Sequence, residues 1–189
     1  RLENEAIKLY MGDKVALDLG QDLVKVKLNQ FYGIEINDFA VSVAKTALWI
    51  AESQMLEETK DIVFANIDFL PLKSYTNIVE GNALTIDWET VVPRDRLSYI
   101  IGNPPFVGIR HSKENHRSQL KTVLEDIPKS GGLDYVTAWY VKATNLMLTK
   151  PNVRTAFVST NSIVQGEQAV TLWHYLIETK GIVINFAYR

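Results

Sequence analysis

The sequence of 189 residues contains no cysteine. This absence excludes disulfides, a catalytic thiol and metals bound through thiolates. The chain also lacks any apolar run approaching the roughly 18 residues that a membrane-spanning helix needs. Its histidines stand without carboxylates at the spacing of metal ligands, so we expect no metal site. The remaining composition, 47% hydrophobic and 22% charged, is typical of a globular domain with its own core.

A five-residue motif indicates the chemistry. Gly102-Asn-Pro-Pro-Phe106 directly follows the apolar, strand-like run Leu97–Ile101. The side-chain oxygen of Asn103 and the carbonyl of Pro104 could each accept one hydrogen of a planar exocyclic amine, which turns the nitrogen lone pair toward a methyl donor. Pro104 and Pro105 stiffen the turn, and Phe106 offers a face on which a flat base can stack. The motif therefore favours methylation of an exocyclic amine, with an ordinary Asn-Pro turn as the alternative.

A carboxylate ends an earlier apolar run. Phe31–Ile36 is strand-like and contains Glu35, and apolar residues then recur at helical spacing over Asp38–Leu56. We predict a helix there, with Asp38 as its N-cap. A carboxylate at the end of a parallel strand is where doubly wound folds bind the ribose of a nucleotide, so Glu35 is a candidate for that role or simply a solvated acidic residue.

A second strand runs into a polar turn. Ile78–Leu84 contains Gly81-Asn82, and in a nucleotide-binding fold the Asn82 side chain can bind the edge of an adenine. Gly-Asn is also a common turn dipeptide.

Strands alternate with helices along the rest of the chain. The pattern predicts an α/β fold, Rossmann-like, with a mostly parallel sheet flanked by helices in a single domain over residues 1–189. The later predicted elements are a helix over Leu133–Leu148, a strand over Arg154–Thr160, a helix over Gln168–Thr179 and a strand over Ile182–Tyr188. Asp134 is the expected cap of the first of these helices. The polar residues Asn161-Ser162, at the end of the first of these strands, are expected to border the substrate pocket.

These motifs, in this order, resemble the amino-group DNA methyltransferases that act on adenine, and most of all the methyltransferase region of type IIG/IIL restriction-modification enzymes. The resemblance implies a class I methyltransferase fold, S-adenosylmethionine as cofactor and a bacterial, cytoplasmic, nucleoid-associated enzyme. Its substrate would be double-stranded DNA with a flipped adenine. By resemblance, Asn103, Pro104, Pro105 and Phe106 are catalytic, and the residues at the cofactor are Glu35, Ile36, Asn82 and Ala83.

The sequence departs from this family at two points. Asn82 stands where many relatives carry Asp, so it keeps an acceptor oxygen but loses the charge. The larger departure lies at the N-terminus. Family members have an N-terminal strand and a glycine-rich cofactor loop, whereas no Gly-x-Gly occurs here. Val15–Gln21 is the nearest candidate, but the distance from Gly20 to Glu35 leaves no room for the intervening helix. We therefore expect a partial methyltransferase domain that binds S-adenosylmethionine weakly when expressed alone. The rest of the parent chain would supply the cofactor loop and the target-recognition domain.

Basic residues gather after the motif, although the net charge is only −2 and the chain does not resemble a self-sufficient DNA clamp. We predict Val107–Ser130 to be a mobile loop with a helical turn around Ser118–Leu124. Arg110 and Arg117 are its candidate contacts to substrate DNA, and a solvated surface loop is the alternative. Methylation of an RNA base or a protein glutamine, or a non-catalytic scaffold role, also stays open.

Overall fold

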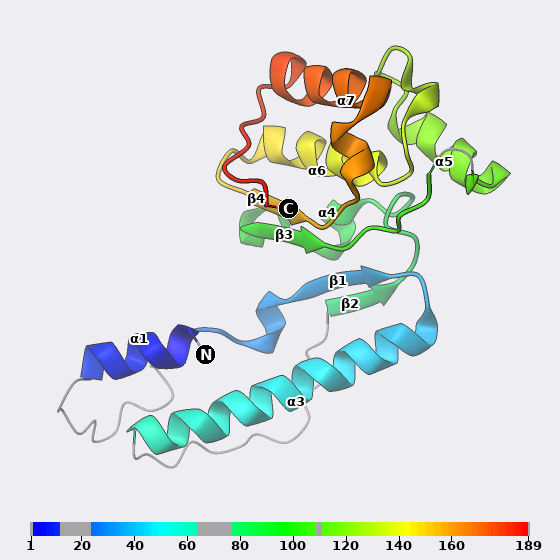
Figure 1. The fold of residues 1–189 in the computed structure, drawn as a ribbon. Coiled ribbons are helices and arrows are strands. Elements are labelled where there is room, and N and C mark those ends of the chain that lie inside the picture. The colour runs from blue at the N-terminus through cyan, green and yellow to red at the C-terminus, as the bar shows by residue number, and fades with distance from the viewer. Residues whose placement is uncertain (1, 12–23, 64–76, 109–110, 189) are drawn as a thin grey trace. The chain divides into compact units, whose positions relative to one another are not determined.

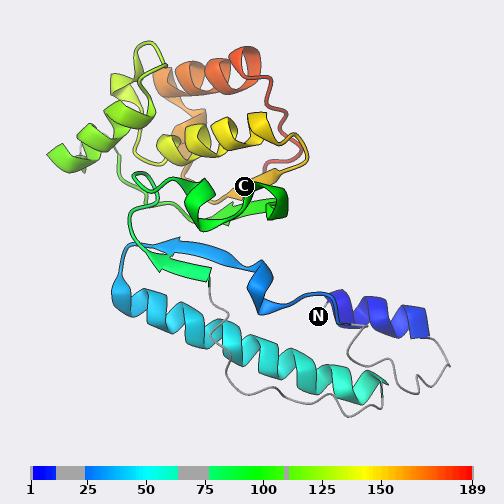
Figure 2. The same cartoon turned by 180° about the vertical axis from the view of Figure 1, so that it is seen from behind.

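The computed structural model describes residues 2–11, 24–63, 77–108 and 111–188. The chain divides into two compact units, Arg1–Val92 and Pro93–Arg189. Figure 1 shows the elements of both units, and Figure 2 shows the same elements from behind. Each unit holds its own pair of parallel strands, and each is described by itself below.

The first unit pairs two parallel strands with one long helix. β1 and β2 align Gly33 with Ile78 and Glu35 with Glu80. Helix α3 contacts both strands along its N-terminal part and contacts α1 along the rest, as both cartoon views show. The elements of this unit are α1 (Leu2–Met11), a 3-10 turn (Leu28–Gln30), β1 (Tyr32–Glu35), α3 (Asp38–Val63), β2 (Asn77–Glu80) and α4 (Trp88–Val91).

Helix α3 begins differently from the prediction and ends later. The Asn37 side-chain oxygen accepts a hydrogen bond from the Ala40 N–H at 2.9 Å, so Asn37 caps the helix and the prediction of Asp38 as N-cap was wrong by one residue. The helix continues past Leu56 to Val63. Thr59, in this added part, is buried, and its hydroxyl lies within hydrogen-bond distance of the Asn4 side chain of α1, at 2.8 Å, and of the Met55 carbonyl, at 2.7 Å.

The second unit packs helices against its own pair of parallel strands. β3 and β4 align Tyr99 with Arg154 and Gly102 with Phe157. In both cartoon views α6 lies between these strands and α7. Most buried apolar side chains of this unit come from α6, α7 and the turns beside them. The elements are a 3-10 turn (Arg94–Arg96), β3 (Tyr99–Gly102), α5 (Glu114–Val123), a 3-10 turn (Ser130–Gly132), α6 (Thr137–Thr149), β4 (Arg154–Phe157), a 3-10 turn (Asn161–Val164), α7 (Gly166–Trp173) and a π-helical segment (His174–Thr179).

Two elements of this unit correct the sequence-based predictions. A ten-residue helix, α5, stands where a loop with one helical turn around Ser118–Leu124 was predicted. The predicted strand over Ile182–Tyr188 is wrong, since no strand is formed in this described segment. The composition of the segment favours a strand, but within the described residues it pairs with no neighbouring strand, and a single strand has no ladder of its own.

The α/β class with parallel strands is confirmed at this level. Within the described residues the strands form two two-stranded sheets, and a single mostly parallel sheet stays a prediction, as does the single domain. Of the helices in the described segments, none is both long and apolar enough to cross a membrane.

Candidate active site

The Asn-Pro-Pro-Phe motif leaves β3 as an irregular segment at the surface of the second unit. Asn103 and Pro105 are exposed, Phe106 is 49% exposed, and Pro104 is buried. The Val158 N–H donates to the Gly102 carbonyl at 3.1 Å, which continues the β3–β4 pairing up to the residue before Asn103. The buried Pro104 ring thus fixes the backbone while the polar and aromatic side chains on either side stay accessible.

An aromatic cluster lies beside the start of this segment. A Cβ added at Gly102 would lie 3.1 Å from the Phe157 ring, closer than most Cβ contacts. Phe157 meets the Tyr140 ring edge-on at 5.2 Å, and Tyr140 in turn meets Trp173 at 5.9 Å. Glycine at position 102 therefore lets β3 pack closely against the Phe157 ring, whose position is also fixed by its contact with Tyr140. The sequence analysis missed this role, although a glycine directly before the motif was its one available signal.

The segment after Phe106 is tied to the start of α6. The Tyr135 N–H donates to the Val107 carbonyl at 3.0 Å. Tyr135 is buried, lies against the His116 ring at 4.5 Å and donates its hydroxyl to Gln119. Its burial and these contacts identify Tyr135 as part of the packing between α5 and the start of α6.

Asp134 is held by a side chain from α7. Its backbone N–H donates to Gln168 Oε1, and its carboxylate accepts from Gln168 Nε2. Its own carbonyl accepts from Thr137 N–H and Oγ1 at the first residue of α6. The predicted cap of this helix thus contacts Thr137 through its backbone carbonyl, and α6 begins four residues later than the predicted Leu133.

In the first unit, the predicted cofactor residues lie together at the carboxyl ends of β1 and β2. The Glu35 carbonyl accepts from the Gly81 N–H at 2.8 Å, which places Asn82 directly beside the end of β1. The Glu35 carboxylate accepts from the Asn37 N–H at 3.1 Å through Oε1. Ile36 is 68% exposed, so the chain at this sheet end is open to solvent.

Asn82 organises its own turn. Its side-chain oxygen accepts from the Leu84 N–H at 2.9 Å, and its carbonyl accepts from the Thr85 and Ile86 N–H groups. The neighbouring Ala83 carbonyl accepts from the Trp88 indole N–H at 2.7 Å. These bonds leave the Asn82 Nδ2 group as the side-chain donor that this turn presents.

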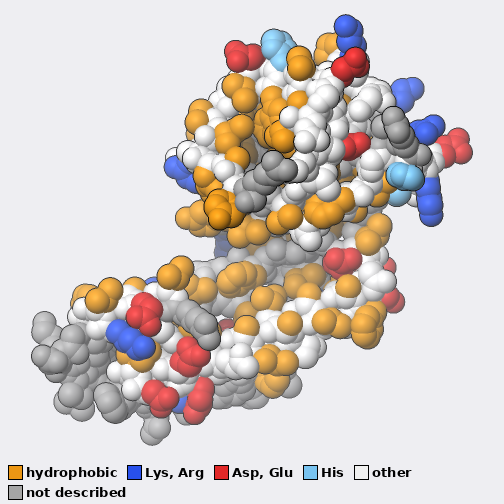
Figure 3. Space-filling view, viewed as in Figure 1, with side chains coloured by type: hydrophobic (Ala, Val, Ile, Leu, Met, Phe, Trp, Pro, Cys, Tyr) orange, Lys and Arg blue, Asp and Glu red, His pale blue; other side chains and the backbone are white. Residues whose placement is uncertain are grey.

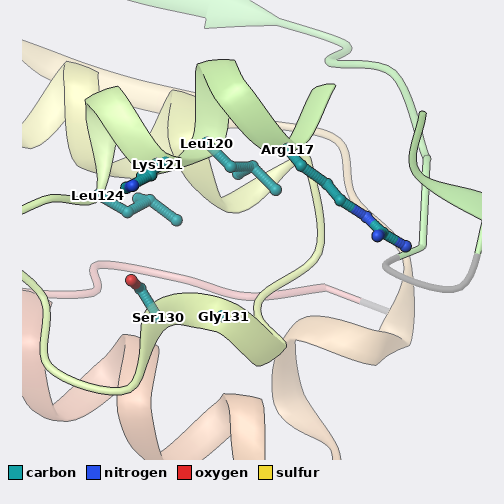
Figure 4. Close-up of a pocket in the computed structure, with 6 residues that line it drawn as sticks. All are labelled: Arg117, Leu120, Lys121, Leu124, Ser130 and Gly131. Carbon is teal, nitrogen blue, oxygen red and sulfur yellow. The ribbon is translucent and has the colours of Figure 1, made fainter. Parts of the chain in front are cut away.

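A basic groove lies between α5 and the 3-10 turn at Ser130–Gly132. Figure 4 shows Leu120, Leu124 and Ser130 directed into it. Its volume is about 420 Å³, and no carboxylate lines it. Neither Arg117 nor Lys121 forms an ion pair within the described residues. Arg110, the other predicted DNA contact, lies outside the described residues. The residues that line the groove are Arg117, Leu120, Lys121, Leu124, Ser130 and Gly131.

The predicted site residues thus form two groups, Glu35 with Asn82 in the first unit and Asn103–Phe106 in the second, each at the carboxyl end of parallel strands. Ligands of α/β folds bind at such strand ends. Parallel strands with helices between them, polar side chains at the strand ends and an Asn-Pro-Pro-Phe turn are features of the DNA methyltransferases as a class.

Comparison with known proteins makes the assignment specific. A family model for the DNA-methyltransferase domain of MmeI matches residues 1–189, and the chain belongs to this family. The structure of the type IIL restriction-modification enzyme MmeI in complex with DNA matches with a TM-score of 0.81 and 36% identity, over 94% of this chain and 25% of that one.

Two curated relatives are similar in sequence. DNA methyltransferase A of Bacillus subtilis (strain 168) is 42% identical over 167 residues, which are 87% of this chain and 19% of the relative. A putative type II restriction enzyme and methyltransferase of Methanocaldococcus jannaschii is 28% identical over 152 residues, 74% of this chain and 12% of the relative. The chain therefore spans about a fifth or less of the curated relatives it matches.

Proposed function

We propose that this chain is the catalytic region of a restriction-modification enzyme that transfers a methyl group from S-adenosylmethionine to the exocyclic amino nitrogen of adenine in double-stranded DNA. The observation that carries the proposal is the Asn103–Phe106 segment at the end of β3, with Asn103 and Phe106 accessible around a buried Pro104. Membership in the MmeI family supports DNA as the substrate.

The chain's own residues hold the amine. Asn103 Oδ1 and the Pro104 carbonyl accept the two N–H groups of adenine, and the nitrogen lone pair then points away from the ring plane. Phe106 stacks on the base once it has turned out of the duplex. S-adenosylmethionine would supply the methyl group to this nitrogen and leave as a thioether, and the methylated amine would release its extra proton to water. Holding the amine in this orientation is the main contribution of the segment.

Glu35 and Asn82 are the proposed cofactor residues. S-adenosylmethionine supplies a methyl group that is bound to a positively charged sulfur. When the methyl group is transferred, the leaving group is a neutral thioether. Glu35 Oε1 is fixed by the Asn37 N–H, and Oε2 remains to accept bonds from the ribose hydroxyls. Asn82 Nδ2 donates to a ring nitrogen of the cofactor adenine, with Ile36 and Ala83 beside it. We propose that other parts of the parent protein, in the bacterial cytoplasm, read the DNA sequence.

The test replaces Asn103 by Ala in the full-length protein. Loss of one of two acceptors for the amine lowers kcat by about 10²–10³-fold, by analogy with the removal of one oxyanion-hole donor. Binding of S-adenosylmethionine, measured by calorimetry, stays within twofold of the wild type, roughly the scatter of such titrations. Asn145→Ala, at an exposed position of α6, is the matched control and keeps full activity.

The product identifies the substrate. Labelled cofactor is offered to the wild-type protein with DNA, RNA and protein, and N6-methyladenine in DNA is the expected product. Label in RNA or in protein glutamine, or normal turnover by Asn103→Ala, would overturn the proposal.

Arg117 is proposed to contact a DNA phosphate from the basic groove. The space-filling view shows basic side chains and a histidine gathered over α5 (Figure 3). Arg117→Glu and Lys121→Glu in the full-length protein should weaken DNA binding equally across sequences, and Arg117→Ala should reduce the salt slope of log Kd by about 1. Lys8→Glu, on the exposed side of α1, is the control. Unchanged binding at low salt would refute the contact.

A further inference from the structure

We infer that Gln168 is a positioning residue that holds the segment after Phe106 in place through Asp134 and Tyr135. The inference rests on the proposed function of Asn103–Phe106. Gln168 stands on α7, well separated in sequence from the motif, and its side chain is half-buried.

The Gln168 amide connects two chain segments. Oε1 accepts from the Asp134 backbone N–H at 3.1 Å, and Nε2 donates to Asp134 Oδ2 at 2.9 Å and to the Ser162 carbonyl at 2.7 Å. Both Nε2 hydrogens and one oxygen lone pair are thus in use. Asp134 is only 8% exposed, so water replaces these bonds poorly if Gln168 is lost.

Asp134 and its neighbour contact the chain directly after the motif. The Tyr135 N–H donates to the Val107 carbonyl, one residue beyond Phe106. A Cβ built at Gly108 would lie 3.7 Å from Asp134 Oδ1, so the carboxylate packs against that backbone. A shift of Asp134 and Tyr135 is therefore passed to Val107 and changes the direction of Phe106.

The other end of the amide holds the segment that follows β4. Ser162 lies in the 3-10 turn Asn161–Val164, shortly after the strand that pairs with β3. Gln168 consequently ties the chain leaving β4 to the residues that fix the chain leaving β3. A displacement of about 1 Å at a reacting group can reduce a rate about 10²-fold, so a clamp of this kind acts on kcat.

The experiment compares Gln168→Leu and Gln168→Glu in the full-length protein. Leucine keeps the volume and removes every hydrogen bond, whereas glutamate keeps the shape and replaces both donors by a charge beside Asp134. Both should lower kcat about 10–100-fold, with the Kd for S-adenosylmethionine unchanged and activity expressed per folded molecule. Gln165→Glu, which makes the same charge change at an exposed position three residues earlier, is the matched control and keeps kcat.

Two further readouts separate positioning from general stability. In the double variant Asp134→Asn/Gln168→Glu, the amide of residue 134 can donate to the carboxylate of residue 168, which restores the lost hydrogen bond with donor and acceptor exchanged. The kcat of the double variant should therefore exceed that of Gln168→Glu alone. Hydrogen exchange should speed up in peptides covering 105–108 and 134–136 in Gln168→Leu, and stay at the wild-type rate over 38–63.

The outcomes distinguish the two proposals. Wild-type protein that methylates DNA while both Gln168 variants retain normal kcat overturns the clamp and leaves the proposed function intact. Wild-type protein that methylates no DNA overturns the proposed function, and the exchange measurement still decides whether Gln168 orders residues 105–108.

Discussion

The two units of the chain differ in how they bury their apolar residues. In the second unit, Leu124, Leu133, Leu172 and Leu176 are all at most 1% exposed. The second unit exposes apolar side chains too, among them Ile101, Val170 and Phe186. Within the described residues, however, the first unit buries fewer apolar side chains, and large ones stand on the surface of its helices α1 and α3 (Figure 3). These exposed residues are Leu2, Leu9, Tyr10, Phe39, Val43 and Ile50.

Because of this difference, the two units should hold their proposed site residues with different rigidity. The proposed amine-binding segment belongs to a unit with a closely packed interior, and packed interiors keep attached groups in one geometry. The proposed cofactor residues belong to a unit organised by one long helix, a two-stranded sheet and a few buried polar contacts. Local opening of the first unit should therefore need less free energy than opening of the second.

The largest expected effect comes from the core of the second unit. Leu172→Ala should lower the free energy of unfolding of this unit by about 2–5 kcal/mol, because Leu172 is fully buried and its loss leaves a cavity. On the surface of the first unit, by comparison, Phe39→Ala at a 74% exposed position should cost no more than about 0.5 kcal/mol. Hydrogen exchange over α6 for Leu172→Ala and over α3 for Phe39→Ala measures the two changes in free energy. Equal losses of free energy would contradict the difference between the units.

A smaller effect is expected where α1 meets α3. Thr59→Val removes the donor to Asn4 Oδ1 and leaves a buried amide, whose Nδ2 already lacks a partner, without this bond. The cost should be about 1–3 kcal/mol. Asn4→Leu combined with Thr59→Val should be more stable than Thr59→Val alone, because both polar groups are then absent. Denaturant unfolding followed over α1 decides this, and a double variant no more stable than the single would argue against the pair.

A third effect on stability, about 1 kcal/mol, is expected at the strand that leads into the motif. Gly102→Ala places a methyl group 3.1 Å from the Phe157 ring, which Tyr140 holds from the other side. The added methyl group displaces the backbone next to Asn103. The activation free energy of methyl transfer should therefore rise by more than the free energy of unfolding falls. A control, Gly132→Ala, adds a methyl where nothing lies within 4 Å, and Gly132 does not line the basic groove. Equal kcat values for the two variants would show that the Phe157 ring moves aside without displacing the motif, and would contradict the prediction.

The four strands of the described residues were predicted well. β1, β2, β3 and β4 all fall within the predicted apolar runs or one residue from them, because a short apolar run followed by a polar turn is a local signal. The same kind of run over Ile182–Tyr188 forms no strand, because pairing with a neighbour is not a local property. The cap of α3 was misplaced because Asn37 and Asp38 are adjacent residues that both favour this position. Helix α5 was underestimated because Leu120 and Val123 are its only apolar residues, which is too few for a helical pattern.

The environment of the motif was beyond sequence reasoning. The position of Asn103–Phe106 after a strand was predicted, but its fixation depends on Tyr135, Gln168 and Phe157, which are distant in the chain. The division into two units likewise depends on which segments pack together. Such contacts arise from tertiary packing, and a single sequence carries no periodicity that reports them.

The double proline also ends the pairing of β3 with β4. Pairing continues to the bond between the Val158 N–H and the Gly102 carbonyl, and in a parallel ladder the next donor from the β3 side would be residue 104. Proline has no N–H, so the ladder stops there and the two chains are released to diverge. A residue other than proline at position 104 would restore the N–H that the next step of the ladder needs, so Pro104 keeps the accessible Asn103 and Phe106 outside the paired part of the sheet.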